Sequence, residues 1–297
     1  MRRVHRLRSN PITIPKKPVT SITERVVQPN ILFAGVQKSG STSIADYLFG
    51  AGVCRPRVFD SEPAWFSKEV HFFDKPKRYE QGLKFYRRRF EKCSHEKFVM
   101  DATPDTFRYP ERVHSTYSSA RDAQTDLVAD LKIIVTLREP VARELSWYNH
   151  QVAQKWIPKV DFEQYATDLF RNLSSPKIEN FGFYAHFLAK WFTLFPRKNI
   201  LVISYDEFKA DPTKVLWRIE TFLGIPETST NPNALGHLNS HNSASKVRLP
   251  SCEVQKTLAD IYEAENQKLY DLLESNPGSS FEQRPFPKFT LGECTHE

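Results

Sequence analysis

The stretch Ile31-Leu-Phe-Ala-Gly-Val-Gln-Lys-Ser-Gly-Ser-Thr-Ser-Ile-Ala-Asp-Tyr-Leu-Phe49 decides the fold. Its apolar start, residues 31–34, predicts a buried β-strand. The turn from Gly35 to Ser43 then combines two glycines, a lysine and four hydroxyl side chains, and an apolar helix follows. A strand that leads through such a turn into a helix presents free backbone N–H groups and the positive end of the helix dipole. The stretch therefore predicts a binding loop for a phosphate or a sulfate.

The lysine of this loop stands in an unusual place. A nucleotide-triphosphate P-loop has the order Gly, four residues, Gly, Lys, then Ser or Thr. Here Gly35 and Gly40 keep that spacing, but Ser41 occupies the lysine position and Lys38 lies inside the loop. The residues that we expect to line the anion site are Lys38, Ser39, Gly40, Ser41, Thr42 and Ser43.

Length and charge set the broad class of protein. A chain of 297 residues with 40% hydrophobic residues is long enough for one large α/β domain or two small ones. The net charge of +7 indicates an anionic partner. No apolar run approaches the roughly 18 residues of a membrane span, so we predict none. The four cysteines are widely spaced, which argues against a disulfide framework, although one distant pair could bridge in a lumenal protein.

A second candidate site lies in the aromatic segment 65–74. If this segment is a strand, Glu69 and His71 share one face, while Val70 and Phe72 take the other. Partial burial raises the pKa of a carboxyl group and a neighbouring imidazole tunes it, so the pair suits a general base. The alternative is an exposed edge strand that carries a Lys68–Glu69 pair.

A third candidate site follows the strongest strand signal. Residues 132–137 are almost all aliphatic or β-branched, which is typical of a central parallel strand. Arg138 leaves the C-terminal end of this strand, and Ser146 falls on the helix predicted over 141–154. Because Arg binds phosphate through two donors, Arg138 and Ser146 form a candidate second anion site. The alternative is that Arg138 is a structural ion-pair partner.

The remaining pattern completes a single α/β domain with a P-loop-like central parallel sheet flanked by helices. Further strands are expected over 97–102 and 199–204, a basic amphipathic helix over 79–92, and other helices over 159–177, 181–195, 211–222 and 253–273. A polar loop over 231–248 contains Lys246 and Arg248. We expect a basic disordered tail over 1–29 and a loose tail over 276–297.

Six segments, in this order along the chain, together resemble the PAPS-dependent sulfotransferases (PAPS is 3′-phosphoadenylyl sulfate). The resemblance is to the carbohydrate, heparan-sulfate-type group in particular. The matching segments are Gly35–Thr42, Lys68–Phe73, Leu137–Arg143 with Ser146, Leu201–Asp206, Phe222–Pro226 and Ile261–Asn266. The resemblance implies a sulfotransferase domain over residues 30–275 that moves a sulfuryl group from PAPS to a hydroxyl or an amine.

The resemblance also assigns roles at the donor. Residues 38–43 would bind the 5′-phosphosulfate of PAPS, and Lys38 would stabilise the bridging oxygen as the sulfuryl group leaves. Arg138 and Ser146 would hold the 3′-phosphate. The basic residues of the polar loop that would close over the cofactor are Lys246 and Arg248. No metal is expected.

On the acceptor side, Glu69 matches the catalytic base of the glycan-type enzymes, and His71 stands beside it. The acceptor itself, a glycan or a small molecule, is not readable, and nor is the oligomeric state. The family's glycan enzymes often carry a Lys before the Thr-Pro that follows the second strand, whereas this chain has Asp101-Ala-Thr-Pro104.

Two other functions are weighed against this one. A P-loop kinase of small metabolites would use ATP and Mg²⁺, with Asp101 as its only serviceable metal-binding acid. A non-catalytic basic module would bind a glycan or a nucleic acid; we expect no nucleic-acid partner. The lack of a membrane anchor favours the cytoplasm. The resemblance to Golgi enzymes and the glycosylation acceptor Asn172-Leu-Ser174 favour the alternative, the Golgi lumen or another organelle.

Overall fold

The computed structural model describes residues 27–60, 62–120, 126–158, 161–173, 182–226 and 251–291. Within them, parallel strands form one sheet in the order β2-β1-β3-β4. The strands are β1 Ile31–Gly35, β2 Met100–Asp101, β3 Lys132–Leu137 and β4 Ile200–Ser204. The sheet is almost wholly buried, which explains the continuous apolar runs in the sequence. The predicted α/β fold with a central parallel sheet is confirmed, but β2 is shorter than the strand expected over 97–102.

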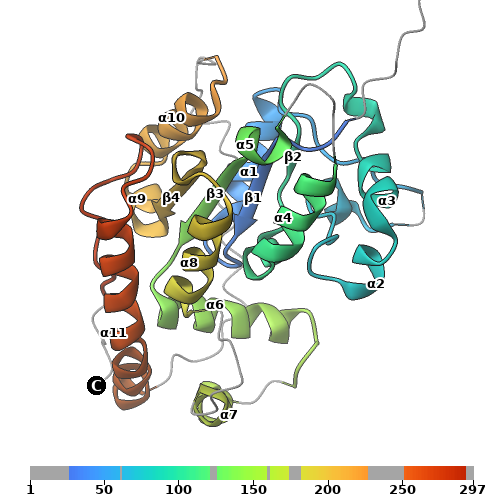
Figure 1. Cartoon of the computed structure of the whole chain (residues 1–297). Coiled ribbons are helices and arrows are strands. Elements are labelled where there is room, and N and C mark those ends of the chain that lie inside the picture. The colour runs from blue at the N-terminus through green and yellow to red at the C-terminus, as the bar shows by residue number, and fades with distance from the viewer. Residues whose placement is uncertain are drawn as a thin grey trace, which may run out of the picture.

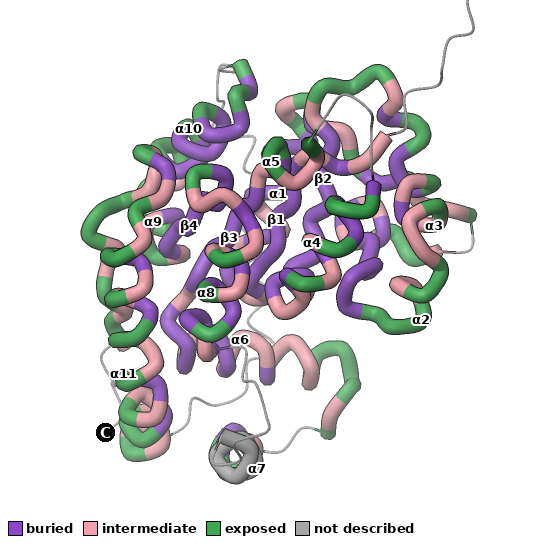
Figure 2. Tube along the Cα trace, in the orientation of Figure 1, coloured by how far each residue is buried: buried purple, intermediate pink, exposed green. Residues whose placement is uncertain are grey.

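Helices cover both faces of the sheet and give three layers (Figure 1). One face carries α1 Ser41–Gly50, α9 Tyr205–Ala210 and α10 Pro212–Leu223; the other carries α4 Pro110–Ser119, α8 Tyr184–Leu194 and α11 Cys252–Ser275. Neighbouring side chains of β1 enter different cores, because side chains alternate along a strand. Leu32 packs in one core with Trp191, and Phe33 packs in the other with Leu48. Figure 2 shows the buried residues concentrated between the layers.

A further pair of helices lies beyond the C-terminal ends of the strands (Figure 1). They are α6 Pro140–Ala153 and α7 Phe162–Leu173, and they share a small core with α11 that contains Tyr148, Phe162 and Tyr262. The Glu139 carboxylate caps α6 by accepting hydrogen bonds from its first N–H groups. Arg138 is therefore fixed between the end of β3 and a capped helix.

Most of the predicted helices are confirmed. Those expected over 141–154, 181–195, 211–222 and 253–273 are α6, α8, α10 and α11, and the segment 159–177 contains α7. The other short elements are η1 Ala64–Ser67, η3 Pro104–Arg108, α5 Leu127–Asp130 and η4 Arg197–Asn199. The polar loop 231–248 and residues 1–26 lie outside the described residues.

Two expected elements are wrong. The basic helix expected over 79–92 is divided into α2 Pro76–Tyr79, α3 Gly82–Arg88 and η2 Glu91–Cys93. Gly82 lies at the break with φ 74°, a left-handed conformation that suits glycine. The segment 65–74 is not a strand: η1 ends at Ser67 and turns follow, in which His71 has φ 51°.

The segment after α11 is also more ordered than expected. We predicted a loose tail, but residues 277–291 pack back onto the domain. Glu282 forms an ion pair with Arg197 at 2.7 Å. Phe286 and Phe289 pack against the core that contains α8. This part of the chain therefore belongs to the folded unit.

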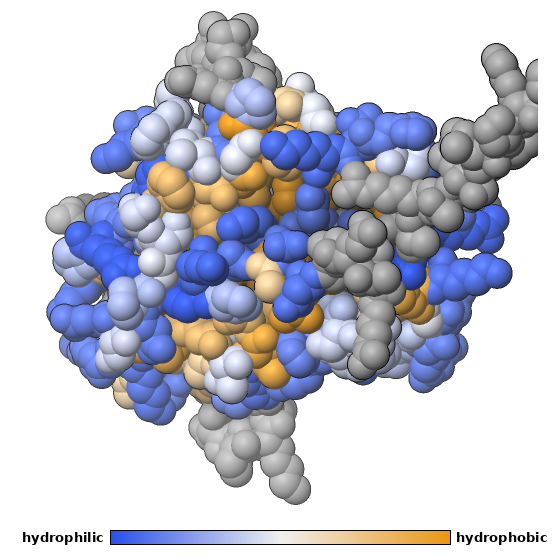
Figure 3. All heavy atoms as spheres, turned by 45° about the horizontal axis from the view of Figure 1, so that its top comes forward, coloured by the Kyte–Doolittle hydropathy of each residue, from blue (hydrophilic) through white to orange (hydrophobic). Residues whose placement is uncertain are grey.

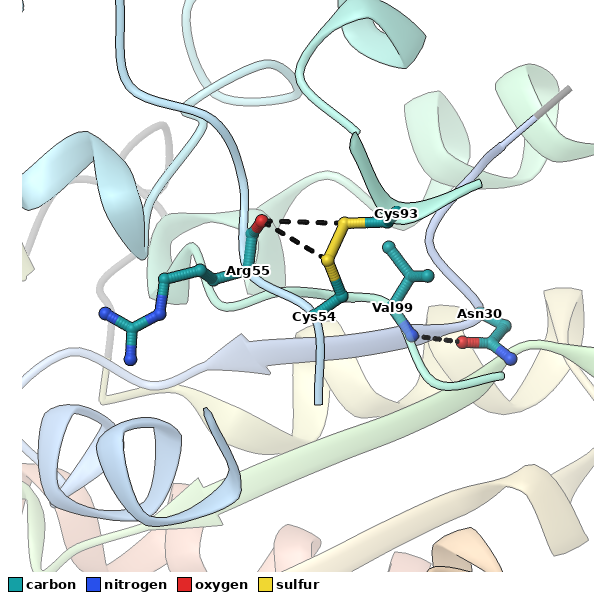
Figure 4. Close-up of a disulfide and its surroundings, with 5 residues drawn as sticks. All are labelled: Asn30, Cys54, Arg55, Cys93 and Val99. Atoms are coloured by element: carbon teal, nitrogen blue, oxygen red, sulfur yellow. Dashed lines mark hydrogen bonds between the residues drawn. A yellow bond between two sulfur atoms is a disulfide. The ribbon is translucent and has the colours of Figure 1, made fainter. Parts of the chain in front are cut away.

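A disulfide joins two segments that are distant in sequence (Figure 4). Cys54 and Cys93 are bridged across 39 residues, beside the backbone of Arg55. Cys252 is disulfide-bonded as well. Wide spacing alone thus failed to reveal these bonds. None of the described helices has the length and apolar character needed to cross a membrane.

Candidate active site

The loop that joins β1 to α1 leaves backbone donors exposed to an anion. Gly40 precedes α1 with φ 82°, no side chain caps the helix, and its first turn carries no acid. No described side chain therefore compensates the positive end of the helix dipole at the N–H groups of Ser41–Ser43. At the other end of the loop, a Cβ on Gly35 would lie 2.7 Å from Phe107 Cβ, so only glycine fits where η3 approaches β1.

Two side chains inside the loop are poorly satisfied without a ligand. Ser39 is fully buried, and its hydroxyl has no hydrogen-bond partner among the described residues. Lys38 has φ 66°, and burial, followed by the charges of Arg138 and Lys68, lowers the pKa of Lys38 to about 8. An unpaired buried hydroxyl and crowded positive charges both cost free energy. An anion bound in the loop would relieve both.

Arg138, which the sequence assigned to a second anion site, lies against this loop. Its Nη1 donates a hydrogen bond to the Lys38 carbonyl at 3.0 Å, and its guanidinium lies over the Tyr205 ring. Arg138 makes no ion pair with a described carboxylate, so the alternative of a structural ion pair is not supported. Ser146 is half-buried on α6, and no hydrogen bond links it to Arg138. The other predicted donor ligands, Lys246 and Arg248, lie outside the described residues.

Lys68 connects the anion loop to the predicted base. Its ammonium donates to Thr42 Oγ1 at 3.3 Å and to Glu69 Oε1 at 2.6 Å. His71 Nε2 lies 3.1 Å from the other oxygen of Glu69. The sequence thus correctly placed Glu69 and His71 together, although turns rather than a strand bring them into contact. Lys68 had been considered only as part of a surface pair.

The protonation of this pair differs from our expectation. Burial does favour a higher pKa for Glu69, but the hydrogen bond from His71 and the charge of Lys68 outweigh it and lower the pKa to about 2. Burial likewise opposes the charged form of His71, but hydrogen bonds with Asp74 and Glu69 raise its pKa to about 9. At neutral pH the site therefore holds a carboxylate between two cations.

A buried network fixes the backbone of the base segment. Asp101 ends β2, and it accepts hydrogen bonds from Thr103 Oγ1 at 2.6 Å and from Tyr86 Oη at 3.1 Å. Thr103 Oγ1 in turn accepts from the His71 N–H at 3.2 Å. Burial raises the pKa of Asp101 to about 6 despite these bonds. Both oxygens of Asp101 are engaged in holding this segment.

Three further candidate residues were not predicted from the sequence, because only the fold brings them together. Asp74 Oδ2 lies 2.7 Å from His71 Nδ1, and Asp105 Oδ2 lies 3.9 Å from the same nitrogen. Gln37 of the anion loop donates to Asp105 Oδ2 at 2.6 Å.

His71, Asp74 and Asp105 are close enough to hold a metal ion. However, the carboxylates at both ring nitrogens favour a protonated imidazole, which cannot be a ligand.

The sulfotransferase domain family model matches residues 28–269. Mouse heparan sulfate glucosamine 3-O-sulfotransferase 3A1 is 26% identical over 275 residues, which are 82% of this chain and 62% of that protein. The bifunctional heparan sulfate N-deacetylase/N-sulfotransferase 1 of Caenorhabditis elegans is 29% identical over 230 residues, which are 74% of this chain and 25% of that protein. The chain thus spans less than two thirds of the length of these curated relatives.

A solved structure shows the same fold. The crystal structure of a sulfotransferase from Alicyclobacillus acidocaldarius superposes with a TM-score of 0.61 at 21% identity. The match covers 84% of this chain and 97% of that one. This likeness supports the sheet and its helical layers.

Proposed function

This chain belongs to the sulfotransferase domain family, and we propose that it transfers a sulfuryl group from PAPS to a hydroxyl or an amine of a carbohydrate acceptor. The observation that carries the proposal is the position of Lys68, which contacts both Thr42 of the anion loop and the Glu69 carboxylate. A donor site and a base therefore adjoin, as in-line group transfer requires. The relatives named for heparan sulfate support a glycan as the acceptor.

The residues of the loop fit the donor. When bound, PAPS would supply the sulfuryl group and a leaving phosphate. The unpartnered Ser39 hydroxyl and the uncapped start of α1 offer donors to its phosphosulfate. Lys38 would neutralise charge on the leaving oxygen, and Arg138, with Ser146, would hold the 3′-phosphate. We keep Lys246 and Arg248 as donor ligands of the polar loop.

Glu69 is proposed as the base that takes the proton from the acceptor. With a pKa of about 2 it is ionised at neutral pH, but it is a weak base in this state. Lys68 is shared between Glu69 and the loop, so a turn of its ammonium toward the loop would remove positive charge from Glu69. The pKa of Glu69 would then rise toward the working pH. His71 would keep the carboxylate oriented and balance its charge.

The direct test is calorimetric titration with PAP, the desulfated product, in parallel with ADP and ATP. We expect PAP to bind tightest, and Arg138→Ala to abolish that preference while weak ADP binding remains. Sulfate transfer from labelled PAPS to heparan sulfate would then establish turnover. Equal affinity for PAP and ADP in the unmodified protein would refute the donor assignment.

The kinase alternative lacks support. It needs an acid that is free to hold Mg²⁺ near the phosphates. Asp101 is the only candidate from the sequence, and both its oxygens accept hydrogen bonds from neighbouring hydroxyl groups. No observation favours ATP as the donor.

We further propose an oxidising compartment, the Golgi lumen or a related organelle. The Cys54–Cys93 bond and the bonded state of Cys252 support it, because disulfides rarely persist in the cytoplasm. This reverses the preference for the cytoplasm that the sequence suggested. Alkylation of the protein isolated from its own cells, followed by mass spectrometry, tests it. Free thiols at Cys54 and Cys93 would contradict the proposal.

A further inference from the structure

Three arginines gather around one phenyl ring at the edge of the molecule near α3. The guanidinium carbons of Arg57, Arg88 and Arg89 lie 5.3, 4.9 and 4.7 Å from the centre of the Phe59 ring. Arg89 is buried and paired with Glu62, whereas Arg57 and Arg88 are exposed. The ring therefore holds two solvent-facing guanidinium groups in fixed positions through cation–π contact.

Two more cations extend this group. Arg55, held over the Phe49 ring at 4.5 Å, is exposed, and so is Lys92. The Arg57 N–H donates to the Arg89 carbonyl at 2.7 Å, and Cys93 Sγ lies 3.6 Å from the Arg55 carbonyl, so the segment 55–57 lies beside the segment 89–93. Burial, together with the charges of Arg55 and Arg57, accordingly lowers the pKa of Lys92. We call Arg55, Arg57, Arg88 and Lys92 the Phe59 patch.

The charges of the Phe59 patch are not neutralised by the fold. None of its members forms an ion pair with a described acidic residue. The nearest acids along the chain, Asp60 and Glu91, are exposed and do not pair with them. Clustered like charges destabilise a fold unless something outside it supplies the opposite charge. The patch is therefore complementary to a polyanion.

A continuous set of contacts leads from the patch to the base. Arg89 lies over the Phe66 ring as well as over Phe59. Arg78 lies over the same Phe66 ring at 4.3 Å and donates to the Val70 carbonyl at 2.6 Å. Val70 stands between Glu69 and His71. The Phe59 patch and the acceptor side of the site are thus parts of one packed segment.

We propose that the Phe59 patch is an exosite for an anionic polysaccharide, which binds the acceptor chain away from the residue that is sulfated. This rests on the proposed function for the identity of the chain. Sulfate and carboxylate groups match the spaced guanidinium groups. Single-stranded nucleic acid fits less well, because its bases need open aromatic faces and the Phe59 ring is already surrounded by guanidinium groups.

The test compares two quadruple variants of the full chain. The first is Arg55→Ala/Arg57→Ala/Arg88→Ala/Lys92→Ala. The matched control removes four exposed lysines elsewhere, Lys198→Ala/Lys209→Ala/Lys214→Ala/Lys256→Ala. Both lose the same charge, so a difference reports position. Binding is measured with heparin by salt elution and by titration, and with single-stranded DNA of equal charge.

We expect the patch variant to lose at least about tenfold in heparin affinity relative to the control. Its affinity for PAP should stay within about twofold, since the patch lies outside the donor loop. Equal loss in both variants would overturn the exosite, and so would tighter binding of DNA than of heparin. If the quadruple variant fails to fold, Arg57→Ala/Arg88→Ala against Lys209→Ala/Lys214→Ala gives the same comparison. Failure of PAP to bind the unmodified protein would instead refute the proposed function alone.

Discussion

Lys68 donates a hydrogen bond of 2.6 Å to Glu69, its neighbour in sequence. The same ammonium reaches Thr42 of the anion loop at 3.3 Å. One side chain thus contacts both halves of the candidate active site, and together with His71 it lowers the pKa of the carboxylate.

Lys68→Ala should raise the pKa of Glu69. The charge of Lys68 and its hydrogen bond both favour the carboxylate, and their loss should move the pKa upward from about 2 by on the order of one unit or more. Carbon-13 NMR of labelled Glu side chains would follow the titration. Lys77→Ala, an exposed lysine close in sequence, is the control and should leave the Glu69 signal unchanged. An unchanged midpoint in Lys68→Ala would show that His71 alone sets the pKa.

Lys38→Ala and Glu69→Gln should separate donor chemistry from proton transfer. We expect Lys38→Ala to lower transfer by about a hundredfold or more and also to weaken PAP binding. Glu69→Gln should lower kcat by about 10²–10⁴-fold with PAP affinity nearly unchanged. Steady-state rates and PAP titrations measure both. Near-normal turnover in either variant would remove that residue from the mechanism.

His71 should make the protein less stable at alkaline pH. Its pKa is about 9 in the folded chain and near 6.5 in an unfolded one, so folding favours the protonated form. That contribution is complete below pH 6.5 and disappears as the pH rises through 9; it amounts to roughly 3 kcal/mol at most. Melting temperature against pH should therefore fall between pH 6.5 and 9. The corresponding slope should be smaller in His71→Gln, and an equal slope would contradict the assignment.

Asp105→Asn should stabilise the ligand-free protein at neutral pH. Burial, together with the charge of Asp74, raises the pKa of Asp105 to about 6, above its unfolded value, so its ionisation opposes folding. This loss of stability develops as the pH rises from about 4 to 6. The variant should melt higher at pH 7.5 but not at pH 4.5. Asp130→Asn, an exposed position, is the control; a gain that is the same at both pH values would exclude ionisation as its cause.

Ser39→Ala should gain stability and lose donor affinity. Removal of a buried, unpartnered hydroxyl should raise the free energy of unfolding by about 1 kcal/mol without ligand. If the hydroxyl binds the donor, PAP should then stabilise the variant less than the unmodified chain. Thermal melting with and without PAP measures both effects. Ser43→Ala, at a half-buried hydroxyl of the same loop, serves for comparison.

The sequence was sufficient to predict those parts of the fold and of the candidate site that depend on local pattern. The apolar runs predicted β1, β3 and β4, because strands buried on both faces need no polar alternation. The displaced Lys38 and the position of Arg138 after β3 predicted two cationic anion-binding groups; that Arg138 contacts the Lys38 loop itself is a finding of the structure. Parallel strands bring their C-terminal ends to one edge, so such inferences need no knowledge of packing.

The remainder depends on contacts between distant segments. Gln37 and Asp105 meet only because η3 packs against the end of β1. The predicted rise in the pKa of Glu69 was wrong. The aromatic neighbours in the sequence indicated burial, which raises the pKa, but not the hydrogen bonds that outweigh it. The Cys54–Cys93 pair could likewise not be distinguished from other pairings by spacing.

The Cys54–Cys93 bond closes a loop of chain that contains Lys68, Glu69 and His71 and also the whole Phe59 patch. The anion loop and Arg138 lie outside it, directly after β1 and β3. In the proposed function, the donor-binding residues and the acceptor-side residues therefore belong to separate parts of the chain, and the acceptor part is covalently closed. We therefore expect an exchange of residues 54–93 between relatives to transfer the preference for the acceptor and to leave donor binding unchanged.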